Sequence, residues 1–286
     1  MIDYQYGGEL PVHDHGYVKL LDVMGTDEDI VDAARISYDR RGESEDRALI
    51  RYLLRHSHST PFEMAVLKFE VKMPIFVARQ WVRHRTASIN EMSARYTELP
   101  AEMFVPEVAA RQSSENKQGR AGKLSDGKLK FEIQSSNDES YVAYEYLLKE
   151  DVAREIARGV LPLNIYTKFI WKMDLHNLMH FLKLRLDPHA QKEIRDYAEV
   201  IERMVAVQFP MAYEAFVDYQ RDAYTCSRME IEILREMLAC YNDHVEGAWG
   251  IENLAANKRM METDAKAGAT MSKRELAEFR RRFLDG

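Results

Sequence analysis

The chain has 286 residues, of which 46% are hydrophobic and 30% charged, and its formal net charge at pH 7 is −7. These values are typical of a soluble globular protein that is long enough to bury a sizeable core. Because an acidic chain repels phosphates, the composition argues against a protein that binds nucleic acid over a broad basic surface. Positive charge in this protein must act locally.

The sequence shows no sign of a membrane or secreted protein. No apolar run approaches the ~20 residues needed to cross a bilayer. The first residues, MIDYQYGGELPVHDHG, lack the basic and then apolar regions of a signal peptide. The two cysteines, Cys226 and Cys240, offer no disulfide framework, and a reducing compartment is the default. We therefore expect a cytoplasmic protein without a membrane partner.

The first quarter of the chain predicts a strand followed by two helices. Residues 16–25 favour a short strand, and Thr26 with Asp29 forms a capping box for the next helix. A second helix is predicted from about Ser44 to His56. The residues expected on the inner faces of the two helices are Ile30, Ala33, Ala34 and Ser37, and Leu49, Ile50, Leu53 and Leu54.

The stretch HSHSTPFEMAVLKFEVKM combines a helix start with a strand. Thr60 to Glu63 matches a capping box with Pro61 at the first helical position. Apolar and polar residues then alternate from 67 to 73, which predicts a half-buried strand. Pro74 opens a helix, IFVARQWV, that ends at Arg83-His84-Arg85.

The second half is predicted to begin with a polar insertion and to continue mainly as helices. Residues 107–139 are rich in Ser, Gly, Lys and Gln, and we expect a surface excursion or a partly disordered insertion there. A strand is predicted at 164–173, then a helix capped by Asp174 and a long helix at 189–208. The apolar stripes of the helices are Tyr144, Leu147 and Leu148; Val152, Ile156 and Val160; Leu175, Leu178, Met179 and Leu182; and Ile194, Ala198, Ile201 and Val205.

Arginines are the candidate anion-binding residues. Arg83, Arg85 and Arg95 lie in WVRHRTASINEMSARY (81–96), and Arg158 and Arg185 each interrupt an apolar stretch. A buried guanidinium without a partner is very costly, and its fork matches phosphate and imide oxygens at two points. We hypothesise that these arginines converge on one anionic ligand; the alternative is solvated charge at helix ends.

Two other kinds of site are less well supported. A metal site could use His13 and His15, His56 and His58, or His176 and His180, but Asn177 replaces the glutamate of the zincin motif and no cysteine is near. We therefore expect no metal. The sequence also has neither the G-x-G-x-x-G nor the G-K-[ST] element of the common nucleotide-binding folds.

Covalent catalysis by a serine is a further alternative. Ser93 lies close in sequence to His84 and Glu91, which suggests a catalytic triad. However, no G-x-S-x-G turn surrounds it, and a helix start at Glu91-Met92-Ser93 would point the two side chains apart. We favour Ser93 as a hydrogen-bond donor to an anion.

Several blocks resemble flavin-dependent thymidylate synthases. The signature is Arg83-His84-Arg85 followed after seven residues by Ser93. AARISYD, HSHSTPFE, PIFVARQWVRHR, SINEMSARY, REIARGVLPLN and LRLDPHAQ also resemble that family's blocks, in order, over roughly residues 16 to 220. The stretch 107–139 and the tail after about 225 lie outside the resemblance, so we expect a domain at 1–225 and a charged helical extension at 226–286.

The resemblance implies an α/β (α+β) fold with a central antiparallel sheet flanked by helices. It also implies a homotetramer whose active sites are shared between subunits. The implied reaction converts dUMP to dTMP, with methylenetetrahydrofolate as carbon donor, FAD as hydride carrier and NADPH as reductant. In such an enzyme the flavin supplies the redox chemistry and the protein supplies placement and charge.

The resemblance also implies roles for individual residues. Arg185 matches an arginine that favours ionisation at the pyrimidine N3, where a fixed cation stabilises developing negative charge. The positions that match dUMP-binding residues are Gln80, Arg83, Glu91, Ser93, Ala94, Arg95, Arg158 and Arg185. Those that match flavin contacts are Thr60, Arg83, His84, Arg85, Glu91, Asp174 and His180, and His58 matches a histidine near flavin and folate.

Two positions depart from the family, and two other function classes stay open. Asp174 and His180 stand where some members have asparagines, and Asp174 can accept a hydrogen bond but not donate one. A regulator that binds a nucleotide without flavin, and a nucleic-acid binder acting through the loop at 83–85, are the alternatives.

Overall fold

The computed structural model describes residues 7–36, 43–114, 117, 119–124 and 127–235. It divides the chain into two units: one from residues 1–40 and 57–210, the other from residues 41–56 and 211–286. Ser37, Cys240 and most of the predicted extension lie outside the described residues. In the described part of the chain, no helix is both long and apolar enough to cross a membrane.

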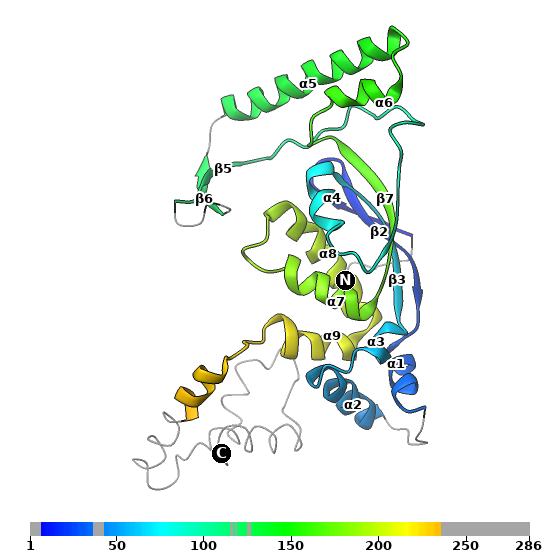
Figure 1. Ribbon diagram of the computed structural model, residues 1–286, viewed down its shortest axis with the longest axis vertical. Helices are drawn as coiled ribbons and strands as arrows, with labels where there is room; N and C mark the ends of the chain where they lie inside the picture. The colour runs from blue at the N-terminus through cyan, green and yellow to red at the C-terminus, as the bar shows by residue number, and fades with distance from the viewer. Residues whose placement is uncertain (1–6, 37–42, 115–116, 118, 125–126, 236–286) are drawn as a thin grey trace. The chain divides into compact units, whose positions relative to one another are not determined.

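A five-stranded antiparallel sheet forms the centre of the first unit (Figure 1). Its strand order is β1 (Glu9–Val12), β2 (Gly16–Met24), β3 (Val66–Pro74), β7 (Tyr166–Asp174) and β4 (Ser88–Glu91). The strands predicted at 16–25, 67–73 and 164–173 are confirmed. β4 is a strand paired with β7, so the helix start predicted at Glu91 is wrong.

Three helices cover one face of this sheet. They are α4 (Ile75–Trp81), α7 (Leu175–Arg185) and α8 (Lys192–Gln208), which lie beside the strands in Figure 1. All the apolar residues predicted for the inner faces of α7 and α8 are buried. The opposite face of the sheet carries half-buried polar side chains, among them Lys19, Glu70 and Lys168. Strict alternation along β3 therefore separates a dry face from a polar one.

Trp81, the last residue of α4, is the centre of the core. It is fully buried, and its ring centroid lies 4.8 Å from that of Phe181 in α7 and 5.2 Å from that of Trp171 in β7. Phe169 and Tyr197 pack edge-on against the same indole, at 5.8 and 6.0 Å. Such edge-to-face contacts add to the hydrophobic gain of burial. The end of α4 is thereby held against strand β7 and two helices at once.

The helix starts were predicted with mixed success. Thr26 caps α1 (Asp27–Ala34) and forms the predicted capping box with Asp29. Asp174 caps α7 by accepting from the Asn177 amide nitrogen at 2.9 Å. The capping box at Thr60 is wrong, because Thr60 already belongs to the short helix α3 (Thr60–Glu63) and Ser59, its N-cap, makes no side-chain capping bond.

The polar stretch at 107–139 is more regular than predicted. It contains a hairpin of β5 (Ala109–Gln112) and β6 (Arg120–Leu124), and then the first half of α5 (Gly127–Lys149). The second half of α5 is anchored, because the Tyr141 hydroxyl donates to the Leu99 carbonyl and the Tyr144 hydroxyl accepts from the Leu99 amide. The first turns of α5 have no continuous apolar stripe, and for this reason the composition predicted an irregular segment there.

The stripe predicted at Val152, Ile156 and Val160 is also wrong. Residues Arg154–Ala157 form the single turn α6, and Arg158–Val160 continue as the 3-10 turn η1. Ile156 is 66% exposed and Val160 is 40% exposed, whereas Ala157 is buried. The spacing of apolar residues suggested a longer amphipathic helix, but in the protomer this short segment does not bury them.

The described part of the second unit joins α2 (Glu43–Arg55) to α9 (Pro210–Phe216) and a π-helical turn (Val217–Arg221). Arg51 donates to Glu214 at 3.0 Å and to Asp218 at 2.7 Å, and its guanidinium lies 4.9 Å from the ring centre of Tyr219. Ile50, Leu53 and Leu54 are buried, as predicted. Within this unit an arginine therefore joins segments far apart in the sequence.

Replacement of Gly16 by alanine is expected to destabilise the fold. An added Cβ would overlap the Tyr197 hydroxyl and lie 2.6 Å from the Val12 carbonyl oxygen. The Tyr197 hydroxyl, which donates to the Lys72 carbonyl at 2.9 Å, would have to move. We expect a loss of about 1–3 kcal/mol in the free energy of unfolding, measured by urea denaturation. Gly122→Ala is the control, because a Cβ there meets no atom within 4 Å; equal midpoints for the two variants would contradict the prediction.

Candidate active site

The turn that follows α4 carries the most basic part of the candidate site. Arg83 and Arg85 are exposed, whereas His84 between them is only 8% exposed. The turn is rigid: the Val82 amide donates to the Ala78 carbonyl and the His84 amide to the Trp81 carbonyl. Among the residues that the structure describes, neither Arg83 nor Arg85 forms an ion pair. Two unpartnered guanidinium groups therefore stand beside a buried imidazole.

Arg185, at the end of α7, reaches this turn from the other side. Its Nε donates to Nε2 of His84 at 3.0 Å, and its Nη2 donates to the backbone carbonyl of Gln80 at 3.2 Å. Nη1 has no hydrogen-bond partner in the described part of the chain. The predicted need for a partner is thus met by two uncharged acceptors. The guanidinium keeps its net charge and one free group of donors.

The protonation state of His84 suits this contact. Burial, with Arg185 and His180 nearby, lowers the pKa of His84 to about 4. The imidazole is therefore neutral at pH 7, and Nε2 can accept from Arg185. Burial also lowers the pKa of Arg185, but a guanidinium stays protonated at neutral pH. A neutral histidine thus orients an arginine without neutralising it.

Glu91 and Ser93 are held apart from His84. Glu91 lies on β4, where its carboxylate accepts from the Thr167 hydroxyl of β7 at 2.5 Å. Ser93 begins the next turn: its Oγ accepts from the Arg95 amide at 3.3 Å and its carbonyl accepts from the Tyr96 amide. No bond joins Ser93 to His84 or Glu91 in the described residues. In the described residues the protomer shows no triad geometry, and the Ser93 hydroxyl contacts one backbone amide, that of Arg95.

The remaining predicted nucleotide contacts lie around the Ser93 turn and η1. Ala94 packs partly against the small cluster of Leu99, Met103 and Ile165. Arg95 pairs with Glu155 at 3.0 Å, with both side chains more than half exposed. Arg158 is exposed and forms no ion pair with any described residue. The expectation that its apolar surroundings bury Arg158 is therefore wrong for the protomer.

The other predicted flavin contacts lie on α7 or next to it and at the start of α3. Asp174 binds Asn177 with both oxygens, accepting from its amide nitrogen and from its side-chain nitrogen at 2.8 Å. His180 is exposed, one turn further along α7. His58 and Thr60 are exposed at the start of α3, which packs against α7. The Asp174 carboxylate is thus committed to its own helix, whereas His180 is free to contact a ligand.

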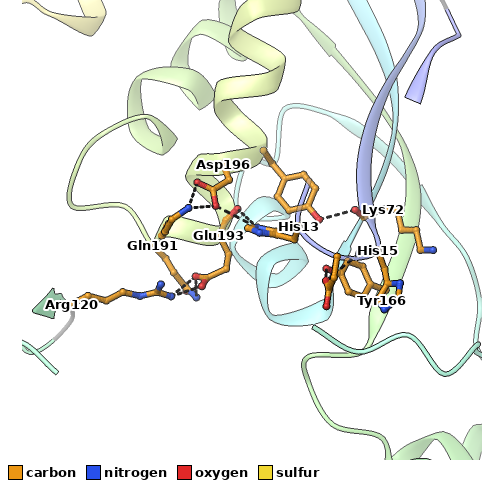
Figure 2. Close-up of polar contacts among 11 residues, drawn as sticks. His13, His15, Lys72, Arg120, Tyr166, Gln191, Glu193 and Asp196 are labelled. Atoms are coloured by element: carbon orange, nitrogen blue, oxygen red, sulfur yellow. Dashed lines mark hydrogen bonds and ion pairs between the residues drawn. The ribbon is translucent and has the colours of Figure 1, made fainter. Parts of the chain in front are cut away.

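Several polar residues at the site were not predicted. Gln191 and Glu193 stand at the N-terminal end of α8, and Arg120 of the β5–β6 hairpin reaches toward them (Figure 2). Gln80 donates through its side-chain nitrogen to Gln191, and Thr167 meets Glu91. One sequence signal was available for Thr167, a polar residue at an inward position of an alternating strand. Gln191 and Glu193 resemble ordinary helix-start residues, so their pattern carried no signal.

The histidine pairs considered as metal ligands do not assemble. In the described ranges, no group of three or more His, Cys, Asp or Glu side chains is arranged to hold a metal ion. His13 instead lies 3.6 Å from Asp196 and packs edge-on against Phe104 and Tyr197. His15 packs against Tyr166, whose hydroxyl donates to Asp14 at 2.5 Å. These residues hold β1 and β2 to their neighbours in the first unit.

Residues 19–211 match a protein-family model described as thymidylate synthase complementing protein. The match includes the 107–139 stretch, which the sequence blocks alone had left outside. A flavin-dependent thymidylate synthase from Thermus thermophilus is 52% identical over 231 residues, which cover 80% of this chain and 86% of that protein. One from Treponema denticola is 47% identical over 247 residues, covering 84% and 93%.

Two solved structures share the fold and more than a quarter of the sequence. Both are crystal structures of the UMP/dUMP methylase PolB from Streptomyces cacaoi, one bound with 5-Br UMP and the other with 5-Br dUMP. The first has a TM-score of 0.68 at 35% identity and covers 73% of this chain and 97% of its own. The second has a TM-score of 0.69 at 33% identity. With its antiparallel sheet, its Arg83-His84-Arg85 turn and these relatives, this chain belongs to the flavin-dependent thymidylate synthase family.

Proposed function

We propose that this protein converts dUMP to dTMP, with methylenetetrahydrofolate as carbon donor and NADPH as reductant acting through FAD. The observation that carries the proposal is the guanidinium of Arg185, held between the neutral His84 and the Gln80 carbonyl with a charged face left open. Family membership supports the flavin and the nucleotide. The cysteine content, typical of a reducing compartment, supports a cytoplasmic reaction.

The nucleotide is bound by two arginines that form no ion pair with described residues, together with polar residues that also have partners within the protomer. Arg83 and Arg158 are exposed and form no ion pair with described residues, so each can bind a phosphate. The turn at Ser93 to Arg95 offers a hydroxyl, backbone amides and a guanidinium in succession. Gln80 and Glu91 provide the remaining polar contacts. This set can surround a small monophosphate, and the net charge of −7 disfavours a polynucleotide.

Arg185 acts on the pyrimidine ring. Its free donors can approach a ring oxygen and N3, where negative charge develops as the ring carbon becomes nucleophilic. A cation fixed in position before the reaction stabilises that charge without reorganisation. His84 supports this role by accepting from Nε, which sets the plane of the guanidinium. The residue thus serves as an electrostatic catalyst and as a nucleotide ligand.

The residues present suit a flavin that supplies hydride transfer. Arg83 and Arg85 stand exposed at the end of a rigid helix, as an anionic dinucleotide requires. His180, Thr60 and His58 are exposed and can donate hydrogen bonds from α7 and α3. Asp174 fits less well, because Asn177 occupies both its oxygens. We therefore assign Asp174 to the start of α7 and His180 to the cofactor.

We propose further that the working enzyme is a homotetramer with shared active sites. Arg158 lies on η1 and, in the described residues, forms no hydrogen bond or ion pair with Arg185 or with the Arg83 turn. The apolar residues Ile156 and Val160 beside it are exposed. A second copy of the chain that covered this surface would bring Arg158 to a site and bury the apolar residues. One protomer carries only part of the cradle.

The proposed chemistry predicts a yellow protein. The purified full-length chain, supplied with FAD, is expected to show the absorption bands of an oxidised flavin that NADPH bleaches. Formation of dTMP should require dUMP, methylenetetrahydrofolate and NADPH together, as followed by chromatography. Omission of each component in turn is the control.

Two outcomes would favour the other function classes. A protein that binds dUMP but never takes up FAD would favour a nucleotide-binding regulator. Nucleic-acid binding would be favoured by an affinity for DNA or RNA that falls steeply with salt. In a plot of log affinity against log salt concentration, the slope would be about −1 for each phosphate contact.

Replacement of Arg185 by alanine is expected to abolish turnover in a folded protein. The variant should lose at least about 100-fold in kcat, because a fixed donor to developing charge is removed. Lys183→Ala, on the exposed side of the same helix end, is the matched control and should keep full activity. Arg185→Lys keeps the charge but not the fork, and intermediate activity is expected. Wild-type turnover in Arg185→Ala would contradict the assigned role.

His84 is expected to make stability depend on pH. Its pKa is about 4 in the folded protein and near 6.5 when unfolded, so the unfolded chain takes up the proton first as pH falls. The free energy of unfolding should therefore drop between pH 6.5 and 4, by about 2–3 kcal/mol in total. His84→Gln, which still offers an acceptor to Arg185, should lack this part of the pH profile. His189→Gln, at an exposed site, is the control and should retain it.

A further inference from the structure

A buried carboxylate at the start of α8 has no place in the function proposed so far. Glu193 is 4% exposed and lies in the first turn of α8. Nη2 of Arg120 donates to its two oxygens, each at 2.5 Å, and Nε2 of Gln191 donates to Oε2 at 2.8 Å. Arg120 itself is partly exposed, on β6 of the hairpin. A surface hairpin thus supplies the counter-charge for an interior acid (Figure 2).

This ion pair continues toward the nucleotide site. Gln191 also accepts, through Oε1, from the side-chain nitrogen of Gln80. The backbone carbonyl of Gln80 in turn accepts from Arg185. A chain of contacts therefore runs from Arg120 through Glu193 and Gln191 to Gln80. Its outer end is a hairpin residue and its inner end is a residue proposed to bind dUMP.

The direction of every hydrogen bond in this chain is set by its charged end. An ionised carboxylate can only accept, so Gln191 must turn its NH₂ group toward Glu193. The side-chain oxygen of Gln191 then faces Gln80, and Gln80 must donate to it with its own NH₂ group. Oε1 of Gln80 is left without a partner among the described residues. The site is thereby given a hydrogen-bond acceptor at this position, and not a donor.

The ionised state of Glu193 depends on Arg120. Burial by itself raises the pKa of Glu193, but the hydrogen bonds from Arg120 and Gln191 outweigh it and keep the pKa below its ordinary value. Removal of the guanidinium would leave a buried carboxylate whose cheapest response is to take up a proton. A protonated Glu193 could donate to Gln191, turn both amides round and present the NH₂ group of Gln80 to the ligand.

We propose that Arg120 is a positioning residue for nucleotide binding: through Glu193 and Gln191 it orients the Gln80 amide so that its oxygen accepts a hydrogen bond from a donor of dUMP. The proposal rests on the proposed function for its ligand. It also gives the polar stretch at 107–139 a role, because the hairpin acts on the site through one guanidinium. Gln112, opposite Arg120 in the hairpin, holds the intervening turn by donating to the carbonyls of Lys117 and Gly119.

The test compares dUMP binding by the full-length protein and its variants with isothermal titration calorimetry between about pH 6 and 8.5. Arg120→Gln is expected to raise Kd about tenfold at the acid end, as a lost charge-assisted hydrogen bond would, and less at the alkaline end, where Glu193 ionises again. Arg120→Lys keeps the charge and should stay within about threefold of the wild type. Arg111→Gln is the matched control, because it removes an exposed arginine of the same hairpin that forms no ion pair with described residues.

A double-mutant cycle separates orientation from a general loss of structure. A Glu193→Gln background has no carboxylate to ionise at this position, so the pH dependence should already be absent there. Adding Arg120→Gln to that background should change Kd by less than about twofold. Effects of the two substitutions that simply multiply would overturn the proposal. So would equal Kd values and pH profiles for Arg120→Gln and Arg111→Gln. Absence of dUMP binding by the wild-type protein would instead overturn the proposed function, and this inference with it.

Discussion

The packing of Trp81 is the constraint on which the rest of the site depends. The indole contacts Phe169, Trp171, Phe181 and Tyr197, and so joins α4 to β7, α7 and α8. Its own N–H and that of Trp171 find no hydrogen-bond partner among the described residues, a cost of about 1–3 kcal/mol each that extensive apolar burial offsets. Because α4 ends at Trp81, the buried cluster also determines where the Arg83-His84-Arg85 turn begins. The basic turn is therefore attached directly to the buried aromatic cluster of the first unit.

The charge of Arg185 is positioned by acceptors that carry no charge of their own. Arg185 is held by the neutral His84 and by a backbone carbonyl, so its positive charge remains available to a ligand. Arg120, in contrast, donates through Nη2 to both oxygens of Glu193. The difference follows from the partner: a buried carboxylate must be neutralised, whereas a buried imidazole with a pKa of about 4 only has to be hydrogen-bonded. The two arginines thus serve different purposes: Arg185 presents a positive charge to a ligand, and Arg120 neutralises a buried carboxylate.

Much of the fold could be predicted from local patterns. The alternation along β3, the caps at Thr26 and Asp174 and the stripe of α8 each depend on a few neighbouring residues, and all were confirmed. The errors came where the pattern did not contain the deciding contact. Composition suggested an irregular segment at 107–139, which in fact contains a hairpin and the first half of α5. An apolar spacing suggested a helix around Ile156 that is only one turn long. β4 was missed because its four residues become a strand only by pairing with β7.

The sequence by itself determined the family and the absence of a zincin or Rossmann motif, and it supplied the arginines proposed to bind an anion, because those depend on residue types at short spacing. Only the tertiary structure decided which of these residues meet. It joined Arg185 to His84 across 101 positions and Arg120 to Glu193 across 73, and it left Arg158 exposed. The reason is that the role of a guanidinium depends on the acceptors around it. Those acceptors come from helices and strands whose packing is set by the whole core. The residue type determines the charge of a side chain, whereas its burial and its partners determine whether that charge is available to a ligand.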